Sequence, residues 1–83
     1  MTEAEILEKL TGIFRDIFED DSLALERGTT AEDVADWDSA NHINIVVSAE
    51  SRFGLRFNSA EVESLHNVGD FVDLIARKLG AKR

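Results

Sequence analysis

The chain has 83 residues, of which 43% are hydrophobic, and a formal net charge of −8. This length predicts one domain over residues 1–83, and the apolar fraction is enough for one small core. The chain contains no cysteine, which excludes disulfides, thiolate metal sites and cysteine nucleophiles. The negative charge excludes nucleic acid as a natural partner, because its phosphates would repel the protein.

The charge is unevenly distributed along the chain. Residues 1–50 hold 13 of the 17 acidic residues and three of the nine basic ones. This asymmetry indicates that the first half faces basic partners, and the alternative is an acidic surface that only aids solubility. No apolar run is long enough to span a bilayer, so we expect a soluble cytoplasmic protein.

The first predicted helix covers residues 3–18 and can begin at Thr2 or Glu3. Its apolar side chains recur at helical spacing at Ile6, Leu7, Leu10, Ile13, Phe14, Ile17 and Phe18. Residues 19–37 show no sustained period, and we expect a long loop with a short helical turn around residues 31–34. Scattered apolar residues could attach this loop to the core, namely Leu23, Leu25, Val34 and Trp37.

The second predicted helix covers residues 39–53, with Asp38 as its cap and Gly54 at its end. Residues 55–57 alternate like a strand but are too few to stand alone. Residues 59–65 indicate one or two helical turns. Asn67 then opens a last helix that Gly80 ends, with apolar positions Val68, Phe71, Val72, Ile75 and Leu79.

The second helix has two apolar stripes. At roughly 100° per residue, the first stripe falls within an arc of about 100° and can face the core. It consists of Ile45, Val46, Ala49 and Phe53. The second stripe, Ala40, Ile43 and Val47, lies on another side, at about 160–220° from Ile45. It is either a docking surface for a partner or a core face covered by the short third helix.

Ser39 lies at the start of this helix, beside Asp38. Free backbone N–H groups there favour an attached anion by roughly 0.3–1 kcal/mol. Asp36 and Asp38 oppose a phosphate ester by about 1 kcal/mol per close pair in water. Because these effects nearly cancel, another enzyme would have to supply the chemistry of attachment. Without further context, an Asp-Ser pair at a helix start is simply a cap.

His42 follows Ser39 by three residues, which leaves a small hydrolase as one reading. The sequence has no Gly-x-Ser-x-Gly elbow, and the helical wheel turns His42 toward the core stripe, which favours packing. His66 is interpreted as a turn residue. We expect no catalytic residue and no metal site, because two isolated histidines are too few ligands. Trp37 is interpreted as a hydrophobic plug, with partner contact as the alternative.

Several short motifs, in order along nearly the whole chain, resemble the acyl carrier protein family. They are Trp37-Asp38-Ser39, His42-Ile43, Glu50-Ser51-Arg52-Phe53-Gly54, Phe57 and Asn67-Val68-Gly69-Asp70-Phe71. The Trp-Asp-Ser form is more similar to stand-alone carriers of specialised pathways than to the housekeeping fatty acid carrier.

The resemblance implies an all-α fold, a small four-helix bundle of acyl-carrier type with three main helices, one short helix and a long first loop. It implies that a phosphopantetheinyl transferase attaches 4′-phosphopantetheine from coenzyme A to Ser39, with Asp38 contributing to transferase recognition. The terminal thiol would carry acyl groups as thioesters between acyl-loading and acyl-using enzymes of a lipid or specialised-metabolite pathway, such as fatty acid or polyketide synthesis. The chain would be a monomeric carrier and not an enzyme.

The resemblance also implies which residues meet partner enzymes. The apolar positions one, four and eight residues after the serine are Ala40, Ile43 and Val47, which form the second stripe. The family usually has leucine in place of Ala40 and more acids along this helix. We therefore expect partners to contact the loop, through Asp33, Asp36, Trp37 and Asp38, more than the helix. An unmodified helical interaction domain that kept the carrier fold is the alternative from another class.

Overall fold

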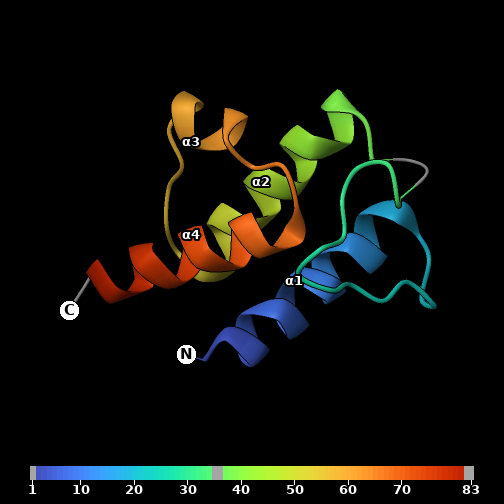
Figure 1. Cartoon of the computed structure of the whole chain (residues 1–83), viewed down its shortest axis with the longest axis horizontal. Coiled ribbons are helices and arrows are strands. Elements are labelled where there is room, and N and C mark those ends of the chain that lie inside the picture. The colour runs from blue at the N-terminus through green and yellow to red at the C-terminus, as the bar shows by residue number, and fades with distance from the viewer. Residues whose placement is uncertain (1, 35–36, 82–83) are drawn as a thin grey trace.

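The computed structural model describes residues 2–34 and 37–81, and these residues form four α-helices (Figure 1). The helices are α1 (Glu3–Phe18), α2 (Ser39–Phe53), α3 (Ser59–Glu63) and α4 (Val68–Ala81). The predicted bundle of three main helices, one short helix and a long first loop is therefore confirmed. Helix α1 packs against both α2 and α4, and the short α3 lies above α4 and beside α2 in the view of Figure 1. No described helix is long and apolar enough to cross a membrane.

Local capping explains where the first two long helices begin and end. The Thr2 hydroxyl accepts the Glu5 N–H at 3.2 Å, and the Glu5 carboxylate accepts the Thr2 N–H at 3.0 Å, which is a capping box. The Asp38 carboxylate accepts the Asn41 N–H at 2.9 Å and caps α2. Gly54 ends α2 in a left-handed conformation, with φ of 66°.

One core lies between the long helices, and most of the predicted apolar positions contribute to it. Its fully buried side chains include Ile6, Leu10, Ile13, Phe14, Ile45, Val68, Phe71, Val72 and Ile75. Loop residues Leu25, Val34 and Trp37 are also buried, so the loop does anchor in the core. Leu74 is buried although the predicted apolar positions of the last helix did not include it, whereas Leu79 is only partly buried.

Two local predictions, on residues 31–34 and on Gly80, differ from the structure. Residues 31–34 form a turn, closed by the Asp33 N–H and the Thr30 carbonyl at 3.0 Å, and not a helix. Residues 55–57, predicted to be too few for a strand of their own, indeed form none, and the Phe57 N–H donates to the Glu50 carboxylate at 2.8 Å. Helix α4 continues past Gly80, which does not adopt the left-handed conformation that ends α2.

The first loop is fastened to the start of α4. The Val68 N–H donates to the Thr29 carbonyl at 2.9 Å, and the Gly69 N–H donates to the Arg27 carbonyl at 2.8 Å. These bonds satisfy two backbone N–H groups that a helix start leaves without partners. The loop therefore runs alongside α4 before it reaches α2.

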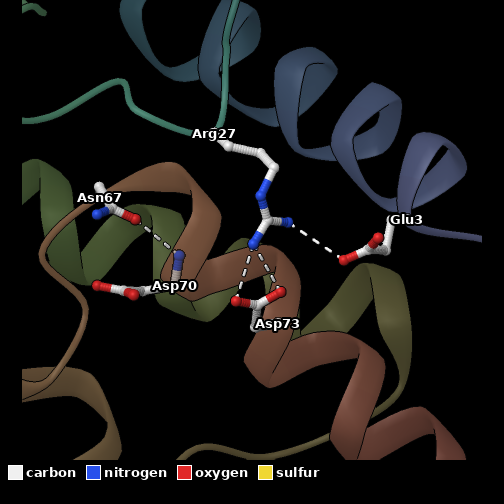
Figure 2. Close-up of polar contacts among 5 residues, drawn as sticks. All are labelled: Glu3, Arg27, Asn67, Asp70 and Asp73. Carbon is white, nitrogen blue, oxygen red and sulfur yellow. Dashed lines mark hydrogen bonds and ion pairs between the residues drawn. The ribbon is translucent and has the colours of Figure 1, made fainter.

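Side chains reinforce this attachment. The Arg27 side chain extends from the loop into the space between α1 and α4 (Figure 2). Its guanidinium donates to both carboxylate oxygens of Asp73 at 2.9 Å and to Glu3 at 3.2 Å. Beside it, the Asn67 side chain accepts the Asp70 N–H at 2.8 Å, which confirms that Asn67 opens the last helix (Figure 2).

Candidate functional site

Ser39 is the first residue of α2 and is exposed to solvent. Asp38 precedes the helix in an extended conformation. The Asp38 carboxylate accepts the Asn41 N–H. The serine therefore stands at the positive end of the α2 dipole, where an attached anion is tolerated. Asp38, which is also exposed, lies next to it in sequence.

A hollow of about 480 Å³, open to solvent, lies beside Ser39. The first loop, the beginning of α2 and the short α3 all contribute to its walls. The lining residues are Ala31, Trp37, Asp38, Ser39, His42, Ile43, Val62, Glu63 and Leu65. We call this hollow the Ser39 groove. The sequence did not identify Val62, Glu63 and Leu65 as part of a site, because their position depends on how α3 folds back over α2.

Trp37 and His42 form the boundary between the Ser39 groove and the core. The Trp37 indole is buried against Phe14, with ring centroids 5.1 Å apart, and stacks on His42. The His42 ring in turn meets the edge of Phe71, with centroids 5.8 Å apart. The interpretation of Trp37 as a hydrophobic plug and of His42 as a packing residue is confirmed.

Both ring nitrogens of His42 have partners. The Trp37 indole N–H lies 3.1 Å from Nδ1, and Nε2 lies 3.3 Å from the Val62 carbonyl oxygen. Indole nitrogen can only donate, so Nδ1 accepts and the proton of the neutral ring is on Nε2. With both nitrogens engaged away from Ser39, His42 is not arranged as a general base for the serine, and the hydrolase reading has no geometric support.

The two stripes of α2 face different environments, as the helical wheel predicts. Ile45, Val46, Ala49 and Phe53 are buried. Ile43 and Val47 are 53% and 56% exposed, and Ala40 is exposed as well. Helix α3 therefore does not cover the second stripe. The beginning of α2 presents an uncovered apolar surface next to Ser39.

The acidic residues of the loop differ in what they do locally. Asp33 is exposed, but its carboxylate accepts the Thr30 N–H at 3.0 Å and so stabilises a turn. Asp36 lies outside the described residues. Among the residues that the structure describes, no group of three or more histidine, aspartate or glutamate side chains could hold a metal ion.

Comparisons with known proteins agree on one family. No family model matches the chain. The acyl carrier protein of Acidothermus cellulolyticus is 34% identical over 76 residues, which cover 92% of this chain and 90% of that protein. The acyl carrier protein of Arthrobacter sp. is 41% identical over 73 residues, which cover 88% of this chain and 82% of that protein.

Two solved structures have the same architecture. The holo acyl carrier protein of Geobacter metallireducens, solved by NMR, superposes with a TM-score of 0.85 at 46% identity and covers 92% of this chain and 87% of that one. A crystal structure of the acyl carrier protein of Thermotoga maritima has a TM-score of 0.86 at 22% identity and covers 98% of this chain and 94% of that one, which supports the fold alone. With relatives above 30% identity over most of its length and the same four-helix arrangement, the chain belongs to the acyl carrier protein family.

Proposed function

We propose that Ser39 carries 4′-phosphopantetheine and that the chain delivers acyl thioesters to partner enzymes. The observation that carries the proposal is an exposed serine at the first position of a capped helix, within a chain whose relatives are named acyl carrier proteins. The holo form of the Geobacter metallireducens relative gives further support. The alternative readings, an unmodified interaction domain and a hydrolase, lack comparable support.

The attachment step needs a partner enzyme. The Ser39 Oγ attacks the phosphorus that bears the pantetheine arm of coenzyme A, and a new phosphate ester bond forms as the pyrophosphate bond breaks. Adenosine 3′,5′-bisphosphate leaves, and the serine proton passes to a base on the transferase. Ser39 has no base of its own in the described structure, since both nitrogens of His42 are occupied elsewhere. The carrier is thus a substrate in this step, and a phosphopantetheinyl transferase supplies the catalytic groups.

The loaded chain needs a surface that acyl-handling enzymes can recognise. The exposed apolar stripe of Ala40, Ile43 and Val47 lies on the same helix as Ser39 and supports this role. The loop acids Asp33 and Asp36, together with Asp38, supply the other part of the proposed surface, whereas Trp37 is buried and contributes only to the lining of the Ser39 groove. Residues 39–49 contain no formal charge, so basic partners would have to find their acidic contacts in the loop. The pathway served would be one of lipid or specialised-metabolite synthesis.

Intact-mass spectrometry tests the proposal directly. The purified chain, incubated with coenzyme A, magnesium and a broad-specificity phosphopantetheinyl transferase, should gain the mass of one phosphopantetheine. Ser39→Ala should abolish the gain while circular dichroism reports unchanged helicity. Ser51→Ala is the matched control, because Ser51 is an exposed serine on the same helix and its removal should leave loading intact. An unmodified wild-type chain, or a Ser39→Ala variant that still gains mass, would refute the proposal.

A further inference from the structure

The His42 Nε2–H makes a long hydrogen bond at the Ser39 groove. Its bond to the Val62 carbonyl is 3.3 Å long, just beyond the ordinary range for such bonds. The Val62 carbonyl also accepts the Leu65 N–H, at 3.3 Å, so it keeps a partner if His42 moves away. The Nε2–H has no such second partner among the described residues. Any molecule that displaces this contact therefore leaves one donor to be satisfied.

The groove places this donor where a carried group can reach it. Ser39 and His42 line the same hollow and lie one helical turn apart on α2. The rest of the wall is largely apolar, with Trp37, Ile43, Val62 and Leu65. An acyl chain lodged in the groove would therefore lie against apolar side chains and against His42.

We propose that His42 makes the Ser39 groove selective for short acyl groups that bear a neutral oxygen acceptor, a hydroxyl or a keto group, over saturated acyl groups of the same length. This inference rests on the proposed attachment at Ser39. A saturated chain that separates His42 from Val62 also covers the Nε2–H and keeps water from it, and a donor that is covered without a partner is costly. A hydroxyl or keto oxygen at that depth accepts the hydrogen bond and removes the cost.

The charges around the groove restrict the cargo further. Asp38 and Glu63, both exposed carboxylates, line the groove. They would repel a cargo that ends in its own carboxylate. The acceptor should therefore be uncharged. His42 is a specificity-determining residue in this proposal and takes no part in bond making.

Two four-carbon acyl groups that differ only in a hydroxyl group test the contribution of that oxygen atom. The transferase can load the chain from butyryl-coenzyme A or from 3-hydroxybutyryl-coenzyme A, and intact mass confirms each product. Both products carry the same arm, so the amide oxygens of the arm cannot produce a difference between them. In the wild type, the 3-hydroxybutyryl form should melt about 4–8 °C higher than the butyryl form, as expected for one recovered hydrogen bond in a domain of this size. The emission of Trp37, the single tryptophan, should also differ between the two forms.

Variants of His42 then show whether the difference in melting temperature comes from its N–H donor or from its ring packing. His42→Phe keeps a ring between Trp37 and Phe71 but lacks the donor, and it should abolish the difference in melting temperature. His42→Gln keeps an N–H donor and should retain part of it. His66→Phe is the matched control, because His66 is exposed and outside the groove lining, and it should leave the difference unchanged.

The two possible failures can be told apart. A chain that gains no mass from either thioester refutes the attachment at Ser39. A chain that loads both cargoes but melts at the same temperature with each refutes the role of His42. A difference that persists in a folded His42→Phe variant refutes it too. If His42→Phe fails to fold, an equal melting temperature of the two wild-type forms still refutes the role of His42, and so does a difference that is undiminished in His42→Gln.

Discussion

Gly69 shows how closely one residue can be constrained by the fold. A Cβ atom at this position would lie 2.9 Å from the Arg27 carbonyl oxygen, which also accepts the Gly69 N–H. At Gly12 in α1, an added Cβ would meet no atom within 4 Å apart from its chain neighbours and the backbone of its own helix. The same glycine-to-alanine change therefore has opposite consequences at the two sites.

The first prediction compares these two glycines. Gly69→Ala should lower the free energy of unfolding by about 1–3 kcal/mol, because the loop and α4 must move apart. Gly12→Ala should raise it by roughly 0.4–1 kcal/mol, because alanine restricts the unfolded chain and favours helix. Urea denaturation followed by circular dichroism measures both. Equal effects of the two changes would show that the loop does not bind α4 this closely.

At the scale of one element, α2 serves two surfaces at once. The core stripe holds α2 in the bundle, and the exposed stripe is available for partners. Truncating an exposed side chain removes little buried area, so its effect on stability should be small. Truncating a buried one leaves a cavity.

The second prediction follows from this contrast. Ile43→Ala and Val47→Ala should each change the free energy of unfolding by less than about 0.5 kcal/mol. Ile45→Ala, on the same helix, should cost about 2–5 kcal/mol. The two exposed changes should still slow acyl transfer from the loaded chain by an acyl-using enzyme. Thermal unfolding measures the changes in stability, and steady-state kinetics measure the rate of acyl transfer. A large loss of stability at Ile43 would assign the stripe to the core.

Helix α3 is too short to be stable alone and depends on contacts with its neighbours. Besides the bond from His42, an ion pair ties it to α4, with the Lys78 ammonium 2.8 Å from the Glu61 carboxylate. The bond from Lys78, and next that from the Asn58 N–H, lowers the pKa of Glu61 below its ordinary value of 4.5. Because the folded pKa is the lower one, this stabilisation is complete above about pH 4.5 and is lost as the pH falls through the folded pKa.

The third prediction uses that pH dependence. Lys78→Met keeps an unbranched side chain but removes the charge, both from Glu61 and from the Phe57 ring, whose centroid lies 5.7 Å from the ammonium, so the pKa of Glu61 should rise. The variant should be less stable than the wild type at neutral pH, and the difference should shrink as the pH falls below about 4.5. NMR titration of the Glu61 carboxyl, with urea midpoints across the same pH range, provides the measurement. An unchanged titration would show that Lys78 does not contact Glu61 in solution.

At the scale of the whole molecule, the net charge of −8 acts over distance and depends on salt. Charges that steer a basic partner toward Ser39 should matter most where they surround it. Screening reduces their range from about 10 Å at 0.1 M salt to about 3 Å at 1 M. A steering effect is therefore recognised by its loss at high ionic strength.

The fourth prediction concerns the loop acids. Reversing Asp33 and Asp36 to lysine should slow transferase loading several-fold at low salt, and the difference should largely vanish at 1 M salt. Glu8→Lys, on an exposed position of α1, is the control and should slow loading much less per reversed charge. Asp33 also stabilises a turn, so helicity must be checked in the variant. An unchanged rate of loading at low salt would mean that the transferase does not recognise the acidic residues of the loop.

Local interactions explain why so much could be predicted from the sequence itself. The bounds of α1 and α2 follow from caps and apolar spacing within a few residues, at Thr2, Asp38 and Gly54. The two stripes of α2 follow from helix geometry alone. The family follows from short motifs in order. Turn and stop signals fixed two details less well, since residues 31–34 form a turn closed by the Thr30 carbonyl and α4 continues to Ala81.

Only the tertiary structure decided how the Ser39 groove is built. The bond between His42 and Val62 joins residues 20 apart, and the pair of Arg27 with Asp73 joins residues 46 apart. Periodicity reports which face of a helix is apolar but not which helix will cover it. The sequence therefore determined the carrier fold and its candidate serine. The positions of α3 and the loop, which create the groove beside that serine, emerge only when the helices pack together, because long-range contacts leave no local pattern to read.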